Sequence, residues 1–459
     1  MNEHPMSRRN FVTNLACGVG GIALSSLLAE QGCARGQHKP HHAPRANSLI
    51  FLNMQGGPSQ FETFTYKPEL NRNAGKTLKV VGGRNAGKFV MPHAFKMNQH
   101  GEAGHYASEL FPNLSSIMYE LCIIESMFSE DNNDAGAQRE VLTGFHRRPM
   151  PCFGSWISYG LGSANRNLPT FVYLANGQHH DSAFLPAQHQ GMPIGRGLRN
   201  IKPFRSKKEQ RAQLDLMSRL NQLQINERDD ASELQARIES AELAFRMQMS
   251  APEAVSFANE SARTLALYGV TGTKKQGRIS RTLTESTADF ARMCLTARRL
   301  VERGARVVSI SVGGRRGWDQ HSNLRAGLKH NARVIDQPIA ALLQDLKQRG
   351  LLESTLVLWG GEFGRTPTAE NAEKADGRNH FPRGYTMWLA GGGVKAGTTY
   401  GRTDELGATI AENKVHIHDL HATLLWLMGL DHRKLTYRYG GRDQTIADIH
   451  GKVVHGIIA

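Results

Sequence analysis

The chain has 459 residues, of which 40% are hydrophobic, 7% aromatic and 21% charged, with 47 glycines, 17 prolines and 5 cysteines. This composition excludes a disordered protein, a collagen-like fibre and a disulfide-rich scaffold, and the length suits about three domains or one large α/β domain with insertions. The formal charge of +15 suggests an anionic polymer as partner, but no recognisable motif, basic helix or aromatic platform supports nucleic acid.

Residues 1–45 predict an export signal and a linker. Arg8 and Arg9 precede an apolar stretch that runs from Phe11 to about Ala29 and is rich in Gly, Ala and Leu. The stretch is too short and too rich in glycine for a stable membrane span, which needs ~20 apolar residues. A twin arginine before such a stretch is typical of twin-arginine export signals. We expect cleavage between Ala29 and Ala46 and a mature protein in the periplasm or cell envelope.

Five short apolar segments predict buried strands. They are residues 48–54, 171–174, 306–311, 355–359 and 386–390. Because these segments are apolar on both faces and helical stretches lie between them, they predict an α/β fold with a mostly parallel sheet covered on both sides. The clearest helix spans residues 332–346, and Pro338 predicts either a kink or the true start of this helix.

Residues 206–303 predict a helical insertion. Leu234, Ile238, Ala241 and Phe245 recur at helical spacing, and a second helix carries Phe290, Met293, Ala297 and Leu300. The basic stretch 196–211 that leads into this region is interpreted as a solvated helix entry.

Two local motifs have simpler explanations than ligand binding. Gly82–Lys88 fits the glycine and lysine positions of a phosphate-binding loop, but Phe89 replaces the required Ser or Thr and no helix pattern follows. We expect a glycine-rich hairpin there. His416, His418 and His421 could suggest a metal, but Asp419 precedes an apolar helical run and favours capping and packing.

The cysteines outside the leader predict buried, inert thiols. Cys122, Cys152 and Cys294 are widely spaced and contain no Cys-x-x-Cys pattern.

Polar loops follow several of the predicted strands. Their acidic and imidazole side chains are Glu62, Asp319, His321, Glu362 and His380. Since ligands collect at the carboxyl ends of the strands in an open parallel sheet, we expect these side chains at one edge. Carboxylates mixed with imidazoles favour Zn²⁺ or Mn²⁺ over Ca²⁺ or Mg²⁺. Arg365 and Arg378 would then supply donors to a bound oxyanion such as phosphate or sulfate.

Long motifs in this order resemble an exported bacterial family called domain of unknown function 1501. They are GGPSQFETF, GSWISYGLG, NLPTFVYL, WDQH, GGEFGRTP, GRNHFPRGYTMWLAGGG and DLHATLLWLMGLD, and the resemblance covers residues 46–458. The family is placed in the alkaline phosphatase and sulfatase superfamily. The resemblance therefore implies a three-layer α/β sandwich with metal at the carboxyl edge of its sheet, formed by residues 46–459.

The position of the superfamily's nucleophile departs from the pattern. Sulfatases carry a Cys, and phosphatases a Ser or Thr, at the start of a helix. In sulfatases a Thr-Gly pair follows the nucleophile motif, and the comparable pair here ends at Gly144. Counting back ten residues from Gly144 reaches Asp134, where members of this family commonly have His. Asp134 could bind metal as a carboxylate.

Further departures from the superfamily pattern favour a site for one metal over an intact two-metal site. Glu62 stands where most of the superfamily has Asp, and Phe363 stands where phosphatases have a His ligand. Asn379 replaces the usual Asp of Gly-Arg-Asp-His. The spacing between Asp319 and His321 is also tighter than in phosphatases.

The first hypothesis is an exported, metal-dependent hydrolase of phosphate or sulfate esters that acts on an anionic small molecule or glycan. Asp319, His321 and His380 would hold one metal, and water activated by that metal would attack directly. Glu62, Asp134 and Glu362 would complete a second or weaker position, and Arg139 or Arg365 would neutralise the oxyanion. The second hypothesis is a non-catalytic binding or scaffold protein of the cell envelope with the same fold.

Overall fold

A computed structural model describes most of the chain from residue 39 onward. The described residues are 39–78, 89–146, 149–165, 167–175, 179–194, 206–225, 242, 245, 253–271, 282–314, 317–371 and 375–459. The twin arginine, the loop Gly82–Lys88, the predicted helix positions Leu234, Ile238 and Ala241, and most of the basic stretch 196–211 lie outside these residues.

A nine-stranded sheet forms the centre of the molecule, in the order β12-β4-β11-β8-β1-β7-β5-β6, with β15 paired to β4. Its strands are β1 (Ser48–Met54), β4 (Leu121–Phe128), β5 (Phe171–Ala175), β6 (Met192–Ile194), β7 (Val307–Val312), β8 (Thr355–Gly360), β11 (Tyr385–Ala390), β12 (Thr398–Tyr400) and β15 (Val415–His416). All five predicted strands are present, and the prediction of a mostly parallel sheet is confirmed. Only β11 runs antiparallel to its neighbours in this sheet, β8 and β4.

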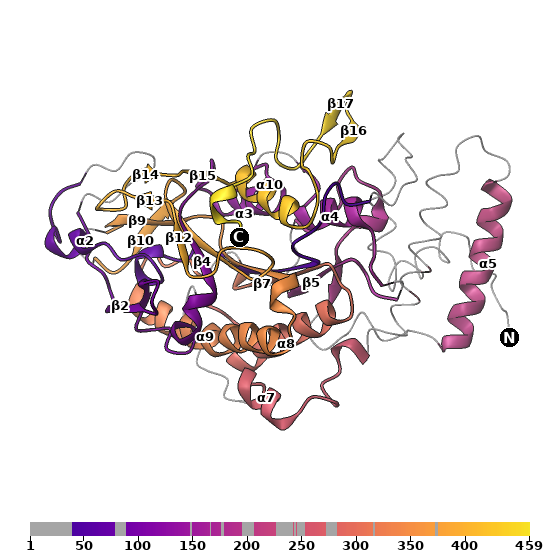
Figure 1. Cartoon of the computed structure of the whole chain (residues 1–459), viewed down its shortest axis with the longest axis horizontal. Coiled ribbons are helices and arrows are strands. Elements are labelled where there is room, and N and C mark those ends of the chain that lie inside the picture. The colour runs from indigo at the N-terminus through magenta and orange to yellow at the C-terminus, as the bar shows by residue number, and fades with distance from the viewer. Residues whose placement is uncertain are drawn as a thin grey trace, which may run out of the picture.

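Helices cover both faces of the sheet (Figure 1). Since successive residues of a strand point to opposite faces, Ile50 and Leu52 of β1 pack into one core while Leu49 and Phe51 pack into the other. The first core includes α7 (Ala262–Tyr268), α8 (Thr287–Glu302) and α9 (Leu324–Gln348). The second includes α3 (Asp134–Thr143), α4 (Phe153–Leu161) and α10 (Ile417–Leu427). The molecule is therefore a three-layer α/β sandwich.

Helix α9 is longer than the predicted segment 332–346. It starts at Leu324, and Pro338 lies inside it rather than at its start. The buried side chains of Leu324 and Leu328 extend its apolar face beyond the predicted start.

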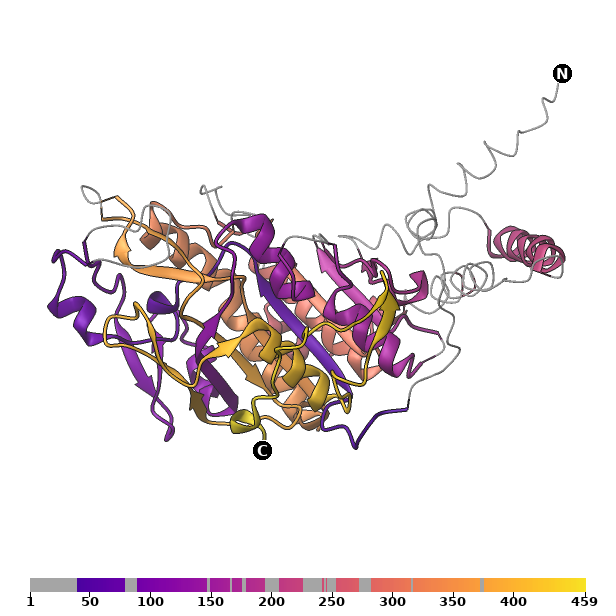
Figure 2. The ribbon, with the colours of Figure 1, turned by 90° about the horizontal axis from the view of Figure 1, so that it is seen from above.

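The predicted helical insertion divides into two parts. Helix α5 (Lys207–Ile225) lies apart from the sheet at one end of the molecule (Figures 1 and 2). Helices α7 and α8 instead pack against α9 and belong to the layer that covers the sheet.

Smaller elements surround this framework. They are η2 (Gln60–Glu62), α2 (Pro68–Arg72), β2 (Met97–His100), β3 (His105–Ser108), η3 (Leu114–Glu120), η4 (Ala187–His189), η6 (Leu352–Ser354), β9 (Gly364–Ala369), β10 (Arg378–Phe381), β13 (Arg402–Thr403), β14 (Ile410–Glu412), β16 (Tyr437–Tyr439), β17 (Arg442–Gln444) and η7 (His455–Ile457). No helix among the described residues has the length and apolar character needed to cross a membrane.

Cys122, Cys152 and Cys294 are free and buried, as predicted, and burial raises the pKa of each thiol.

Candidate metal centre

Three side chains direct donor atoms to one point beside the sheet. Asp319 Oδ1 lies 2.7 Å from His321 Nε2 and 2.9 Å from His380 Nε2, and the two imidazole nitrogens are 3.0 Å apart. Asp319 and His321 come from the loop after β7, and His380 comes from β10. A tight turn, in which the His321 N–H donates to the Asp319 carbonyl at 3.1 Å, allows both donors of the short Asp-x-His motif to face the same point. In the part of the chain that the structure describes, these three residues form the one group whose geometry suits a metal ion.

The outer nitrogen of each imidazole already has an acceptor. His380 Nδ1 lies 2.7 Å from the carbonyl oxygen of Asn132, and His321 Nδ1 is hydrogen-bonded to the carboxylate of Glu370. A carbonyl oxygen and a carboxylate only accept, so both Nδ1 atoms carry hydrogen when these bonds form. When a ring is neutral, its lone pair is then at Nε2 and faces the carboxylate of Asp319; when a ring is protonated, its Nε2–H donates to that carboxylate instead. Three electron-rich atoms this close together are the arrangement that a divalent cation stabilises.

Asp319 is held in place by a buried arginine. Arg365 Nη2 donates to Asp319 Oδ1 at 2.9 Å, and the Arg365 side chain is only 1% exposed. Burial alone would raise the pKa of Asp319, but hydrogen bonds with the two histidines and the charge of Arg365 lower it below its ordinary value. Gly56 makes this packing feasible, because its φ is 106° and a Cβ there would lie 2.7 Å from the backbone nitrogen of Trp318.

Asp134 lies at the edge of this group, at the first position of α3. Its Oδ1 is 3.6 Å from His380 Nε2, is buried, and has no hydrogen-bond partner among the described residues. Burial raises the pKa of this carboxyl. An unpartnered buried oxygen beside three donors suits a fourth ligand or an acceptor for a proton from water.

Glu140 fixes the loop that carries Asn132 to the start of α3. Its two carboxyl oxygens accept the backbone N–H groups of Glu130 at 2.9 Å and Asp131 at 3.1 Å. Burial raises the pKa of Glu140 from 4.5 to about 7. His416 lies 3.9 Å away, but burial lowers its pKa to about 4, so it carries no positive charge near neutral pH.

The raised pKa of Glu140 predicts a pH-dependent contribution to stability. The folded chain retains this proton up to about pH 7, whereas the unfolded chain releases it near 4.5, so the contribution is present at low pH and disappears as the pH rises through 7. Relative to Glu140→Gln, the wild-type free energy of unfolding should fall by about 3 kcal/mol between pH 4.5 and 8. Urea unfolding across this range measures the difference. Exposed Glu353→Gln is the control, and a constant wild-type-minus-variant difference for Glu140→Gln would contradict the assignment.

Glu62 is placed away from the donor atoms, contrary to its predicted role as a ligand. It forms a fully buried ion pair with Arg378, in which Arg378 Nη2 lies 2.8 Å from Glu62 Oε1. Ser59 and Arg378 Nε also donate to the carboxylate of Glu62. Arg378 in addition donates to the carbonyls of Thr366, Met91 and Pro92, so its donors are used inside the protein rather than for an oxyanion. The pair ties η2 to the hairpin that carries His380.

Glu362 is also bound by protein groups and lies outside the convergent set. It accepts the backbone N–H of Gly56 at 2.8 Å and the Gln138 amide at 2.7 Å, and burial raises its pKa to about 7. The oxygen of the Gln138 amide in turn accepts from Asn53 and Gln55. An uncharged hydrogen-bond network therefore surrounds the carboxyl that would have served a second metal.

Phe363 also argues against a second metal site. Its ring stacks on the imidazole of His380, with centroids 4.1 Å apart and an angle of 29° between the planes. An apolar ring thus stands where the resemblance implies a histidine ligand in phosphatases.

The two arginines predicted to neutralise an oxyanion have other partners. Arg139 donates to the carbonyl of His146 at 2.9 Å, beyond the C-terminal end of its own helix. Arg365 donates to Asp319 and to the carbonyls of Gly56, Gly57, Trp318 and Arg378. Its role in this structure is to hold Asp319 and the adjacent backbone.

The histidines at the start of α10 have structural roles, as expected. His418 Nε2 bonds to the Gly144 carbonyl at 2.6 Å, and His421 Nε2 bonds to the Val141 carbonyl at 2.9 Å. The helix cap differs from the prediction, because His416 is the N-cap and Asp419 is the third helical residue of a capping box.

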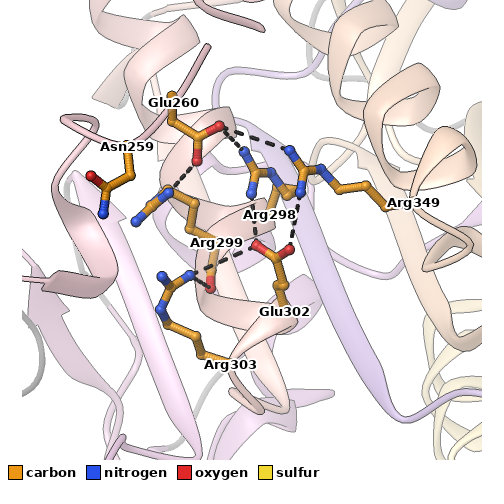
Figure 3. A pocket seen from close by; sticks show the side chains of 7 residues that line it. All are labelled: Asn259, Glu260, Arg298, Arg299, Glu302, Arg303 and Arg349. Atoms are coloured by element: carbon orange, nitrogen blue, oxygen red, sulfur yellow. Dashed lines mark hydrogen bonds and ion pairs between the residues drawn. The ribbon is translucent and has the colours of Figure 1, made fainter.

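A separate cavity of about 410 Å³ lies near the C-terminal ends of α8 and α9 (Figure 3). It is lined by Asn259, Glu260, Arg298, Arg299, Glu302, Arg303 and Arg349. Each of the four arginines is paired with a carboxylate, and Arg298 and Arg349 each contact Glu260, Glu302 and Asp345. The network joins the segment that contains Glu260 to α8 and to Arg349 just after α9, which is a structural role.

The sequence did not reveal three groups that organise the centre: the carbonyl of Asn132, the carboxylate of Glu370 and the amide of Gln138. A backbone carbonyl leaves no sequence signal. Glu370 follows β9 without a distinctive motif, and only the pairing of β9 with β10 shows that it reaches His321.

The fold and the site together define an α/β protein with a candidate metal centre at the carboxyl edge of a mostly parallel sheet. The chain belongs to the DUF1501 family, described as a protein of unknown function, which matches residues 46–458. A comparison with curated protein sequences found no match.

Several solved structures are distantly similar. A protein in the alkaline phosphatase superfamily from Vibrio parahaemolyticus is 10% identical, with 99% of this chain and 80% of that chain covered and a TM-score of 0.41. The phosphonate monoester hydrolase from Silicibacter pomeroyi is 11% identical, with 75% and 71% covered and a TM-score of 0.35. A magnesium-bound mutant of TAB5 alkaline phosphatase, an enzyme of an Antarctic bacterium, is 11% identical, with 84% and 99% covered and a TM-score of 0.36.

Proposed function

We propose that this protein is an exported, metal-dependent hydrolase of phosphate or sulfate esters. The observation that carries the proposal is the convergence of Asp319 Oδ1, His321 Nε2 and His380 Nε2, with both outer imidazole nitrogens already hydrogen-bonded. A divalent cation held there would supply Lewis-acid stabilisation of developing negative charge and would activate water. Two imidazoles and a carboxylate favour Zn²⁺ or Mn²⁺ over Ca²⁺ or Mg²⁺.

The chain's own residues define the rest of the proposed mechanism. Asp134 is the side chain with a free buried oxygen beside the donors, so its Oδ1 would complete the ligand set or accept a proton from the attacking water. The resemblance places Asp134, rather than a Ser, Thr or Cys, at the position of the superfamily's nucleophile. We therefore propose direct attack by water without a covalent intermediate. The bonds that occupy Glu362, and the position of Phe363, support one metal per chain.

The route out of the cytoplasm is part of the same proposal. Arg8 and Arg9 before the apolar stretch to Ala29 support twin-arginine export to the periplasm or cell envelope. An envelope location favours an anionic small molecule or a glycan ester over nucleic acid as the partner of this basic chain.

One observation favours a second candidate function. Arg139 and Arg365, the predicted oxyanion donors, are both engaged in internal hydrogen bonds. A non-catalytic protein that binds an anionic glycan or an envelope partner would retain the fold without requiring those donors.

Metal analysis followed by an ester assay tests the proposal. The mature chain, purified without chelator, should contain about one Zn²⁺ or Mn²⁺ per molecule, because the three convergent donors suit one cation and leave a position on it for water. It should hydrolyse aryl phosphates or aryl sulfates, lose this turnover after chelation and regain it on adding the same metal. A metal-free protein that turns over neither aryl phosphates nor aryl sulfates would contradict the proposal. A loaded protein without turnover that binds sulfated polysaccharide would favour the second function.

A further inference from the structure

The hairpin formed by β9 and β10 contributes to the candidate centre twice. His380 lies on β10, opposite Arg365 of β9, and Glu370 follows directly after β9. The Glu370 backbone N–H donates to the Gly377 carbonyl at 3.0 Å, which closes the hairpin beside the donors.

The end of this hairpin is also fastened to the segment that carries His321. The backbone N–H of Asn323 donates to the Asp376 carboxylate at 3.2 Å, and the N–H of Leu324 donates to the Asp376 carbonyl at 2.8 Å. These bonds fix the position of Glu370 relative to His321. The contact between the two side chains therefore follows from the backbone pairing of two segments.

We infer that Glu370 is a positioning residue that prepares His321 to bind a cation, an inference that rests on the proposed metal centre. Its carboxylate accepts from His321 Nδ1, which keeps the hydrogen on Nδ1 and the lone pair on Nε2. Without Glu370 the other tautomer becomes favourable, because a hydrogen on Nε2 would point to Asp319 Oδ1 only 2.7 Å away. That tautomer satisfies Asp319 internally and leaves His321 without a donor for metal.

The two histidines are supported unequally. His380 is held by the neutral carbonyl of Asn132, whereas His321 is held by a negative charge. A carboxylate stabilises the positive charge that an imidazole acquires on donating to a cation, and raises its basicity more than a carbonyl does. Glu370 therefore makes His321 the stronger of the two imidazole donors.

Zinc titration of the mature chain against a competing chelator tests this role. Glu370→Ala should weaken Zn²⁺ binding about 10–100-fold, the usual effect of removing such an outer partner. Glu370→Gln keeps an accepting oxygen without the charge, so its loss should be smaller. With Co²⁺ in place of zinc, the visible absorption bands of Glu370→Ala should shift, because the ligand field of His321 changes. Exposed Glu353→Ala is the matched control and should behave as wild type.

Urea unfolding of the metal-free variants separates positioning from a general structural role. The Glu370 side chain is 31% exposed, so the unfolding midpoint of metal-free Glu370→Ala should stay at the wild-type value. Wild-type zinc affinity in Glu370→Ala would overturn the inference and leave the metal centre standing, as would a lowered midpoint with unchanged affinity. A wild-type chain that binds neither Zn²⁺ nor Co²⁺ would instead overturn the proposed metal centre itself.

Discussion

Asp319→Asn should reduce metal affinity by at least ~100-fold, since even the loss of an outer partner of a ligand costs 10–100-fold. Asp319 Oδ1 lies within 3 Å of both imidazole donors, and it carries the negative charge of the convergent set. Asn retains a carbonyl oxygen for Arg365, so the substitution removes the charge without leaving the guanidinium unpartnered. Competition titration with Zn²⁺ measures the affinity, and ester turnover should fall in parallel.

Two further variants define what the Asp319 result means. His380→Ala removes a different donor and should reproduce the loss of metal, whereas Asp443→Asn in the exposed β16–β17 hairpin should leave binding unchanged. Unaltered metal content in both Asp319→Asn and His380→Ala would contradict the assignment. Binding of sulfated polysaccharide that survives both substitutions would favour the non-catalytic function.

Arg378→Met should lower the free energy of unfolding by about 3–5 kcal/mol, because it leaves a buried carboxylate without its counter-charge. Both members of the Arg378–Glu62 pair are fully buried, so water cannot replace the missing partner. Arg378 also satisfies three backbone carbonyls, which would lose their donors. Urea unfolding of the metal-free protein measures the effect apart from any contribution of bound metal.

The double variant Arg378→Met with Glu62→Leu identifies the cause of this loss. Removing both charges should recover much of the stability lost in the single variant, because the unpaired charge is the main cost. Arg402→Met, which breaks an exposed pair with Glu412, should leave the unfolding midpoint unchanged. Equal stability of Arg378→Met and wild type would show that the buried pair contributes little.

The sequence predicted the framework well because it is built from local patterns. Apolar runs such as residues 48–54 and 355–359 can be stable only when both faces are buried, and both are central strands. The direction of β11 could not be read in the same way, because an apolar strand has the same composition in either direction. The prediction placed the start of α9 near Ala332 and left Pro338 as either a kink or the start, whereas the helix begins at Leu324 and continues through Pro338.

The candidate site was predictable to the extent that it depends on strand order. Asp319 and His321 follow β7, and His380 was expected at the same edge, where the structure brings it to them. Glu62 and Glu362 occur in equally polar loops, yet Arg378 and Gln138 engage them. Which acid pairs with which donor depends on side-chain packing between segments hundreds of residues apart, and no local spacing encodes it. The contact of Glu370 with His321 depends in the same way on how the β9–β10 hairpin folds back.

The separation of the donors along the chain affects how the protein would be assembled. Asp319 and His380 are 61 residues apart, so one cation shared by them would act as a cross-link that closes this loop. The complete donor set exists only after β10 has docked, so the folded state binds the ion and the unfolded chain does not, and binding would raise resistance to unfolding. A chain exported through the proposed twin-arginine route would fold first, acquire its ion in the cytoplasm and carry it across the membrane. The metal supply of the cytoplasm, rather than that of the envelope, would then decide which ion the mature protein contains.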